Sequence, residues 1–150
     1  MGKLKNHKLL VTGYENDDIE SFVKKLEDND VKILVDVREL PLSRKKFFSK
    51  NALNEQVKRS KIQYVHYREL GSPREIRHKL KNSDMSYRDF FVAYRKHLIK
   101  NEKELQELIE MLKYSDVCLM CYEEQTSACH RTIIVDELLK LNPKLQVMSV

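Results

Sequence analysis

The sequence contains little of what marks the special classes of protein. Its 150 residues include three Gly and three Pro, which predicts few long loops, and three Cys, an odd number that does not make a disulfide framework. No apolar run approaches the roughly 20 residues that span a bilayer, and the N-terminal segment lacks the apolar core of a signal peptide. We therefore expect a cytoplasmic protein with reduced thiols and no membrane association. A chain of this length is the usual size of one domain, predicted here over residues 1–150.

The formal net charge of +5 hides an uneven distribution. Residues 44–100 hold 16 Lys and Arg against 5 Asp and Glu, a local balance of +11, whereas the rest of the chain is net negative. A basic segment on an acidic frame is typical of proteins that bind nucleic acid or another polyanion. The alternative is that these charges lie on ordinary solvated helix faces. The sequence names no cofactor, and the predicted partners are a nucleic acid or a phosphorylated small molecule.

Short apolar runs alternate with stretches of helical spacing along the chain. The runs predict strands near residues 8–12, 32–37, 62–67, 117–122 and, as a closing strand, 145–150. Strands separated by helices favour an α/β fold. We expect a single domain with a mainly parallel sheet of four or five strands flanked by helices, in a Rossmann-like three-layer arrangement.

All three cysteines lie in one stretch, from Cys118 to Arg131. This stretch begins as an apolar run, continues as a polar loop and ends where an amphipathic helix is predicted to begin. In parallel sheets the strand ends meet at one edge, where ligands gather. Polar side chains also follow the strand predicted at 32–37. We therefore expect one cleft at the carboxyl edge, formed by Asp36, Arg38, Glu123, His130 and Arg131. Cys118 is interpreted as a small buried hydrophobic residue.

Several short motifs occur in a specific order along most of the chain. They are Thr12-Gly-Tyr14, Asp36-Val-Arg38, Pro41-x-Ser43-Arg44, Tyr64-x-x-Tyr-x-x-Leu70-Gly71, and Cys121-x-Glu123 followed by Cys129-His-Arg131. Together they resemble the domain-of-unknown-function 488 family. The resemblance implies a fold and the location of a site at these motifs, and it implies no particular reaction. Family members commonly carry a second glycine after the Leu-Gly pair, where this chain has Ser72.

Arginines near strand ends and a helix start favour an anion site. Guanidinium groups suit phosphate, and a helix N-terminus adds a favourable field. Arg38, Arg44 and Arg131 are the predicted anion ligands, and Asp36 is expected to orient Arg38. We also expect Glu123 to pair with Arg131, because a carboxylate at a buried strand end needs a partner. The first hypothesis is thus a protein that binds, or acts on, a nucleic acid or a phosphorylated ligand.

Two other hypotheses stay open. Glu123, Cys129 and His130 are candidate catalytic residues, because a carboxylate or imidazole can move protons and a thiol near a helix start can become a nucleophile. These residues could also do the chemistry in an enzyme that acts on a phosphorylated ligand. A separate hypothesis is a metal- or thiol-dependent enzyme that uses Cys121, Cys129 and His130, although the adjacent positions of Cys129 and His130 at a helix start disfavour a dedicated metal site. The last hypothesis is a non-catalytic nucleic-acid-binding module. A concave, partly buried cluster would favour an enzyme, and a broad basic surface would favour the module.

Overall fold

The computed structural model describes residues 7–122 and 130–150. Within these residues, five strands form one sheet in the order β3-β2-β4-β1-β5, and every neighbouring pair is parallel. The strands are β1 (Lys8–Gly13), β2 (Ile33–Asp36), β3 (Gln63–His66), β4 (Val117–Cys121) and β5 (Gln146–Ser149). The predicted α/β fold with a parallel sheet is confirmed.

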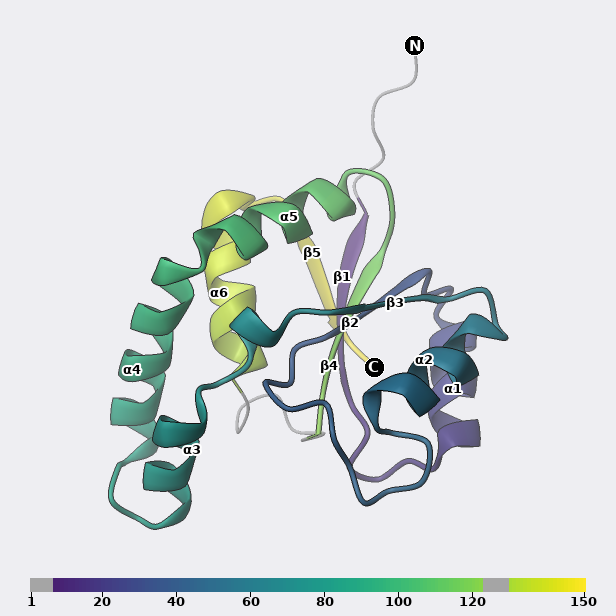
Figure 1. Cartoon of the computed structure of the whole chain (residues 1–150). Helices are drawn as coiled ribbons and strands as arrows, with labels where there is room; N and C mark the ends of the chain where they lie inside the picture. Colours follow the sequence, from purple (N-terminus) through teal and green to yellow (C-terminus); the bar gives the residue numbers. More distant parts are fainter. Residues whose placement is uncertain (1–6, 123–129) are drawn as a thin grey trace.

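Helices cover both faces of the sheet (Figure 1). They are α1 (Ile19–Asp28), α2 (Lys50–Lys58), α3 (Arg74–Lys81), α4 (Tyr87–Lys100), α5 (Glu102–Leu112) and α6 (Arg131–Leu141), with a short 3-10 helix η1 (Arg68–Leu70) after β3. The first two pack against one face, and α4, α5 and α6 supply the apolar side chains that cover the other. No helix in the described part of the chain has the length and apolar character needed to cross a membrane.

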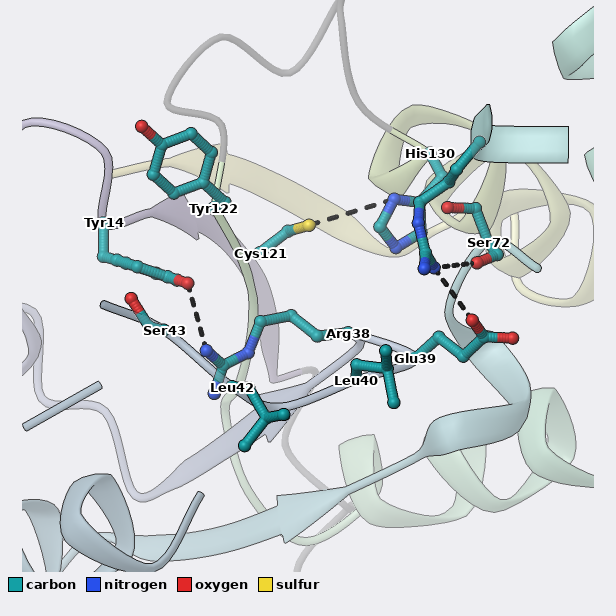
Figure 2. A pocket seen from close by; sticks show the side chains of 11 residues that line it. Tyr14, Arg38, Glu39, Leu40, Leu42, Ser43, Ser72, Cys121, Tyr122 and His130 are labelled. Atoms are coloured by element: carbon teal, nitrogen blue, oxygen red, sulfur yellow. Dashed lines mark hydrogen bonds and ion pairs between the residues drawn. The ribbon is translucent and has the colours of Figure 1, made fainter. Parts of the chain in front are cut away.

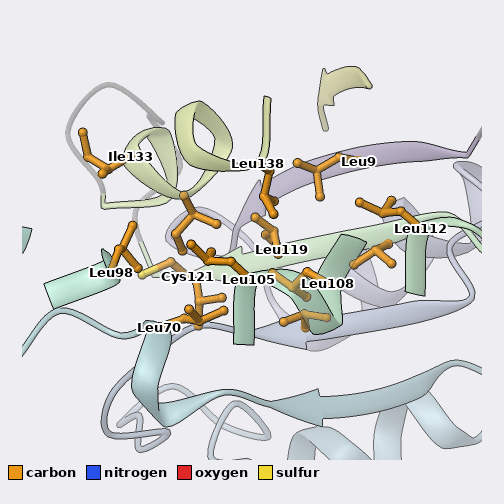
Figure 3. Packing of buried hydrophobic residues seen from close by; sticks show 14 of the residues in the cluster. Leu9, Leu70, Leu98, Leu105, Leu108, Leu112, Leu119, Cys121, Ile133 and Leu138 are labelled. Carbon is orange, nitrogen blue, oxygen red and sulfur yellow. The ribbon is translucent and has the colours of Figure 1, made fainter. Parts of the chain in front are cut away.

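Strand β4 lies at the centre of the sheet and divides the core. All five of its residues are buried. Because side chains alternate along a strand, Leu119 and Cys121 join the apolar cluster on the α5 and α6 face, while Cys118 and Met120 join the cluster on the α1 and α2 face. Figure 3 shows the first of these clusters, which includes Cys121. Cys121, the last residue of β4, therefore packs in the core and also lies at the carboxyl edge of the sheet.

The chain changes from one face of the sheet to the other before it enters β4. Strands β1, β2 and β3 are connected through α1 and α2, and β4 then inserts between β2 and β1. Such a switch point opens a crevice beyond the carboxyl ends of the strands. The backbone N–H of Tyr14 donates to the carbonyl of Cys121 (3.3 Å), and that of Val37 donates to the carbonyl of Met120 (3.1 Å). The residues that follow β1, β2 and β4 thus meet in one place.

Candidate functional site

A pocket of about 320 Å³ lies at this carboxyl edge. Figure 2 shows that its side chains come from the ends of the strands, from the segment after β2, from the turn after η1 and from the start of α6. The lining residues are Tyr14, Arg38, Glu39, Leu40, Leu42, Ser43, Ser72, Arg77, Cys121, Tyr122 and His130. The pocket is concave and partly buried, which is the feature expected of an enzyme rather than of a flat binding surface.

Cys121 and His130 face each other in this pocket. The Sγ atom of Cys121 lies 3.9 Å from Nδ1 of His130, within hydrogen-bond distance for sulfur, and each residue is 6% exposed. The other ring nitrogen, Nε2, lies 2.9 Å from the carbonyl oxygen of Val37. A carbonyl oxygen can only accept, so the Nε2 atom must carry the proton. In the neutral ring, Nδ1 is then an acceptor that points at the Cys121 thiol.

The ring of His130 is also held by packing. It meets the ring of Tyr94 edge to face, with 5.2 Å between the ring centroids. Tyr94 is itself buried, and its hydroxyl donates to the carbonyl of Leu70. A base that is oriented by a third group next to a nucleophile is the arrangement found in nucleophilic catalysis.

Asp36 and Arg38 form a buried ion pair at the same edge of the sheet, and Arg38 lines the pocket. Nε and Nη2 of Arg38 donate to the two carboxylate oxygens of Asp36 at 2.9 and 2.7 Å, and Nη1 donates to the hydroxyl of Tyr14 at 3.0 Å. Burial disfavours the charged guanidinium, but the hydrogen bonds and the charge of Asp36 outweigh it and raise the pKa of Arg38. The predicted orienting contact between Asp36 and Arg38 is present in this geometry.

Two further contacts fix the ion pair. The hydroxyl of Tyr64 donates to Asp36 at 2.5 Å, and burial together with the negative charge of Asp36 raises the pKa of this tyrosine. Nε2 of His66 lies 2.7 Å from the carbonyl oxygen of Arg38 and donates to it. Asp36 is completely buried, and the donors of Arg38 and Tyr64 hold its carboxylate in place. The charge of Arg38 is thus compensated before any ligand arrives.

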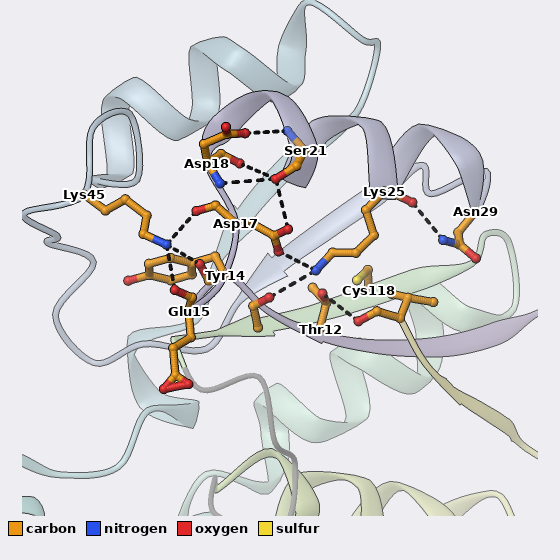
Figure 4. Close-up of polar contacts among 12 residues, drawn as sticks. Thr12, Tyr14, Glu15, Asp17, Asp18, Ser21, Lys25, Asn29, Lys45 and Cys118 are labelled. Atoms are coloured by element: carbon orange, nitrogen blue, oxygen red, sulfur yellow. Dashed lines mark hydrogen bonds and ion pairs between the residues drawn. The ribbon is translucent and has the colours of Figure 1, made fainter.

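Tyr14 lines the pocket, although it is not among the individual site residues predicted from the sequence. Its ring stacks on Phe48 with 4.5 Å between centroids, and Tyr122 meets it edge to face at 5.4 Å. The ammonium group of Lys45 donates to the carbonyl of Tyr14 at 2.8 Å and to the carbonyls of Glu15 and Asp17 (Figure 4). The signal was available, because Tyr14 follows an apolar strand just as Arg38 does.

The opposite wall of the pocket depends on Gly71. A Cβ atom on this residue would lie 2.2 Å from the backbone nitrogen of Glu39, so only glycine permits the close approach of the two segments. Nη1 of Arg77 donates to Glu39 at 3.0 Å and also to the carbonyl of Ser72. Ser72 takes the place of the family's second glycine and lines the pocket.

The structure separates the three predicted anion ligands. Arg38 lines the pocket, and Arg44 is exposed and does not line it. Arg131 is completely buried at the start of α6, and its Nη1 donates to the carbonyl of Thr12 at the end of β1. Its position favours a role in joining α6 to the sheet. Anion binding by these arginines stays a prediction.

Two of the predicted catalytic residues, Glu123 and Cys129, lie outside the described residues, and so does the predicted pair of Glu123 with Arg131. Cys118 is buried, as expected, and burial raises the pKa of its thiol to about 12. Among the described residues, no group of three or more His, Cys, Asp and Glu side chains is placed to hold a metal ion.

The basic segment contributes exposed charges on α3 and at the start of α4. Helix α3 has no buried residue. Its exposed cations include Arg74, Lys79 and Lys81, and Arg88 follows on α4. None of these four residues lines the pocket, although Arg77 of α3 does.

Comparison with known proteins identifies the family. Residues 18–138 match the model of the family described as domain of unknown function DUF488. The match covers most of the chain, and the chain belongs to this family. No curated protein and no solved structure matches the sequence.

Proposed function

We propose that the protein is a thiol-dependent enzyme in which Cys121 attacks an electrophilic small molecule bound in the pocket. The observation that carries this proposal is the contact between Cys121 and His130, in which the carbonyl of Val37 leaves Nδ1 of His130 as the acceptor. The pocket volume of about 320 Å³ suits a small molecule.

The chemistry requires only groups that face the pocket. His130 takes the proton of the Cys121 thiol at Nδ1, and the thiolate sulfur attacks the electrophilic centre. A bond forms between sulfur and that centre, and the leaving group departs with its electron pair. The leaving group then receives the proton from His130. General base catalysis of this kind contributes about 10²–10⁴-fold to a rate.

This proposal favours the thiol-dependent enzyme over the other hypotheses drawn from the sequence. An anion site built on Arg38 and Arg131 is less well supported, because Arg131 is completely buried and Arg38 is already paired with Asp36. The metal version of the enzyme hypothesis has no supporting cluster in the described residues. The thiol version has both a nucleophile and an oriented base.

Alkylation by iodoacetamide tests the proposal. The reagent is small and neutral, and peptide mapping by mass spectrometry gives a separate rate for each cysteine. We expect Cys121 to react in the folded protein, while Cys118 stays unmodified because it is completely buried and its thiol has a pKa of about 12.

His130→Gln is the matched variant. The glutamine amide can still donate to the carbonyl of Val37, but it offers no basic nitrogen to the thiol. We expect the alkylation rate of Cys121 at neutral pH to fall at least about tenfold, which corresponds to about 1.4 kcal/mol in the barrier. An unchanged rate in a folded His130→Gln variant would contradict the proposal.

Nucleic-acid binding is a second proposal and is independent of the thiol. The exposed cations Arg74, Lys79 and Lys81 on α3 support it, together with the local charge of +11 over residues 44–100.

A further inference from the structure

We propose that Tyr14 donates a hydrogen bond to the carbonyl oxygen of an acyl substrate as that oxygen becomes negatively charged, so that the substrate is a small ester or thioester. This inference rests on the proposed function, because attack by Cys121 is the step that creates the charge.

The hydroxyl of Tyr14 accepts one hydrogen bond, and its proton is available for another. Nη1 of Arg38 donates to this oxygen at 3.0 Å, so the O–H bond must point elsewhere. Among the described residues, no hydrogen bond has the Tyr14 hydroxyl as its donor, although the side chain is only 2% exposed and lines the pocket. A buried donor of this kind requires an explanation, and a ligand oxygen in the pocket provides one.

The position of this donor is fixed before any substrate binds. Phe48 stacks on the ring at 4.5 Å with an interplanar angle of 11°, and Lys45 holds the backbone of Tyr14 through its carbonyl. The hydrogen bond from Arg38 also polarises the hydroxyl and makes it a stronger donor. A rigid, polarised donor needs no reorganisation when charge develops in the transition state, which is how oxyanion-stabilising groups act.

The charges around the pocket favour an oxygen that is neutral at first. Arg38 is paired with Asp36 at 2.7 Å, and Arg77 is paired with Glu39 at 3.0 Å. The cations of the lining are therefore compensated, which is a poor match for a substrate with a permanent double negative charge. A carbonyl oxygen carries its full negative charge only in the tetrahedral intermediate. An acyl compound fits this environment better than a phosphate ester.

The mouth of the pocket adds an apolar surface. Leu40, Leu42 and Tyr122 line it and are 51%, 71% and 47% exposed. Exposed apolar side chains next to a polar reactive centre suit a substrate with an apolar group attached to its carbonyl. We assign this surface to the acyl chain or the leaving group.

The reaction is balanced with water as the second reactant. His130 takes the thiol proton, Cys121 Sγ bonds to the carbonyl carbon, and the π electrons move to the oxygen that Tyr14 contacts. The intermediate collapses, the carbon–oxygen or carbon–sulfur bond to the leaving group breaks, and His130 returns the proton to that group. Water then attacks the acyl-enzyme thioester while His130 takes its proton; the carbon–sulfur bond breaks, the acid leaves, and His130 returns the proton to the Cys121 sulfur.

Tyr14→Phe tests the inference, because it removes the hydroxyl and keeps the ring. The acylation of Cys121 by p-nitrophenyl acetate and p-nitrophenyl butyrate is followed by nitrophenolate release and by mass spectrometry. We expect kcat for acylation to fall about 100-fold with little change in KM, which is the effect of losing one oxyanion donor. Alkylation by iodoacetamide, which displaces iodide and creates no oxyanion, should change less than about twofold.

The two reagents separate the possible failures. If alkylation depends on His130 but acylation is the same in Tyr14→Phe, or if neither ester acylates the wild type, the acyl inference is overturned and the thiol enzyme stands. If alkylation does not depend on His130, the proposed function fails, and the acyl inference fails with it.

An isosteric replacement covers the case in which Tyr14→Phe does not fold. 3-Fluorotyrosine at position 14 keeps the hydroxyl and makes it a stronger donor. The ratio of acylation to alkylation should rise, and an unchanged ratio would overturn the inference.

Discussion

His130 and Val37 lie 93 positions apart in the chain, and Nε2 of His130 donates to the carbonyl oxygen of Val37 across 2.9 Å. This bond connects the start of α6 to the segment that follows β2. It exists because β4 lies beside β2, with the backbone N–H of Val37 bonded to the carbonyl of Met120 at 3.1 Å. The orientation of the proposed base is therefore a consequence of the strand order.

Removal of the Asp36 carboxylate should destabilise the protein strongly. Asp36 is completely buried and holds two nitrogens of Arg38, so Asp36→Ala leaves a buried guanidinium without its counter-ion. We expect the free energy of unfolding, measured with urea, to fall by about 3–5 kcal/mol. The control Tyr64→Phe removes one hydrogen bond to the same carboxylate and should cost about 1 kcal/mol. Equal effects of the two variants would contradict this role of Asp36.

Lys45 should contribute far more stability than its neighbour Lys46. The ammonium group of Lys45 donates to the carbonyls of Tyr14, Glu15 and Asp17 and thereby ties the segment after β2 to the loop after β1. We expect Lys45→Met to lower the free energy of unfolding by about 2 kcal/mol. Lys46 is exposed, and Lys46→Met should change the free energy of unfolding by less than about 0.5 kcal/mol. Both values come from urea titrations under the same conditions. Similar losses of unfolding free energy in the two variants would contradict this role of Lys45.

The thiol of Cys118 should make stability depend on alkaline pH. Burial raises its pKa from 9.0 to about 12, so the unfolded chain loses this proton at a lower pH than the folded protein. The stabilising contribution is fully present below pH 9 and is lost as the pH rises from 9 to 12. Relative to Cys118→Ala, the free energy of unfolding of the wild type should fall by about 1.4 kcal/mol per pH unit in this range. Parallel pH profiles of stability for the wild type and Cys118→Ala would contradict this contribution of the Cys118 thiol.

The basic segment should bind nucleic acid in a salt-dependent way. Fluorescence anisotropy with a labelled oligonucleotide measures the affinity at several salt concentrations. Neutralising Lys79 and Lys81 on α3 with Gln should lower the slope of log K against log salt by about 0.9 for each phosphate that the protein no longer neutralises. Lys103→Gln is the control, because Lys103 is exposed on α5 outside the basic segment. Absence of binding at low salt would overturn the proposal.

The three central strands could be predicted from the sequence because parallel strands buried on both faces appear as apolar runs. Val117 to Cys121 is such a run, and it forms the central strand. The strand order was not predictable, since the insertion of β4 between β2 and β1 depends on how the helices pack on each face. The convergence of Arg38, Cys121 and His130 follows from the rule that polar residues at strand ends share an edge.

Other parts of the site depend on side-chain direction, which spacing does not give. Arg131 lies at a helix start, as the sequence predicts, but its guanidinium is buried against the carbonyl of Thr12. The sequence favours Cys129 over Cys121 as the nucleophile because Cys129 adjoins His130. The described geometry instead brings His130 to Cys121, nine positions away. In the sequence Tyr14 is only part of a motif, and nothing in the pattern of apolar residues predicts its bond to Arg38.

The central claim is that His130 presents an unprotonated Nδ1 to the thiol of Cys121. The ¹⁵N chemical shifts of the His130 ring, assigned with a His130→Gln variant and compared with those of Cys121→Ala, test it most directly. We expect a protonated Nε2 in both proteins, and in the wild type an unprotonated Nδ1 that accepts a hydrogen bond from the thiol and loses it in Cys121→Ala. A neutral ring with its proton on Nδ1, or an Nδ1 shift that does not respond to Cys121→Ala, would contradict the claim.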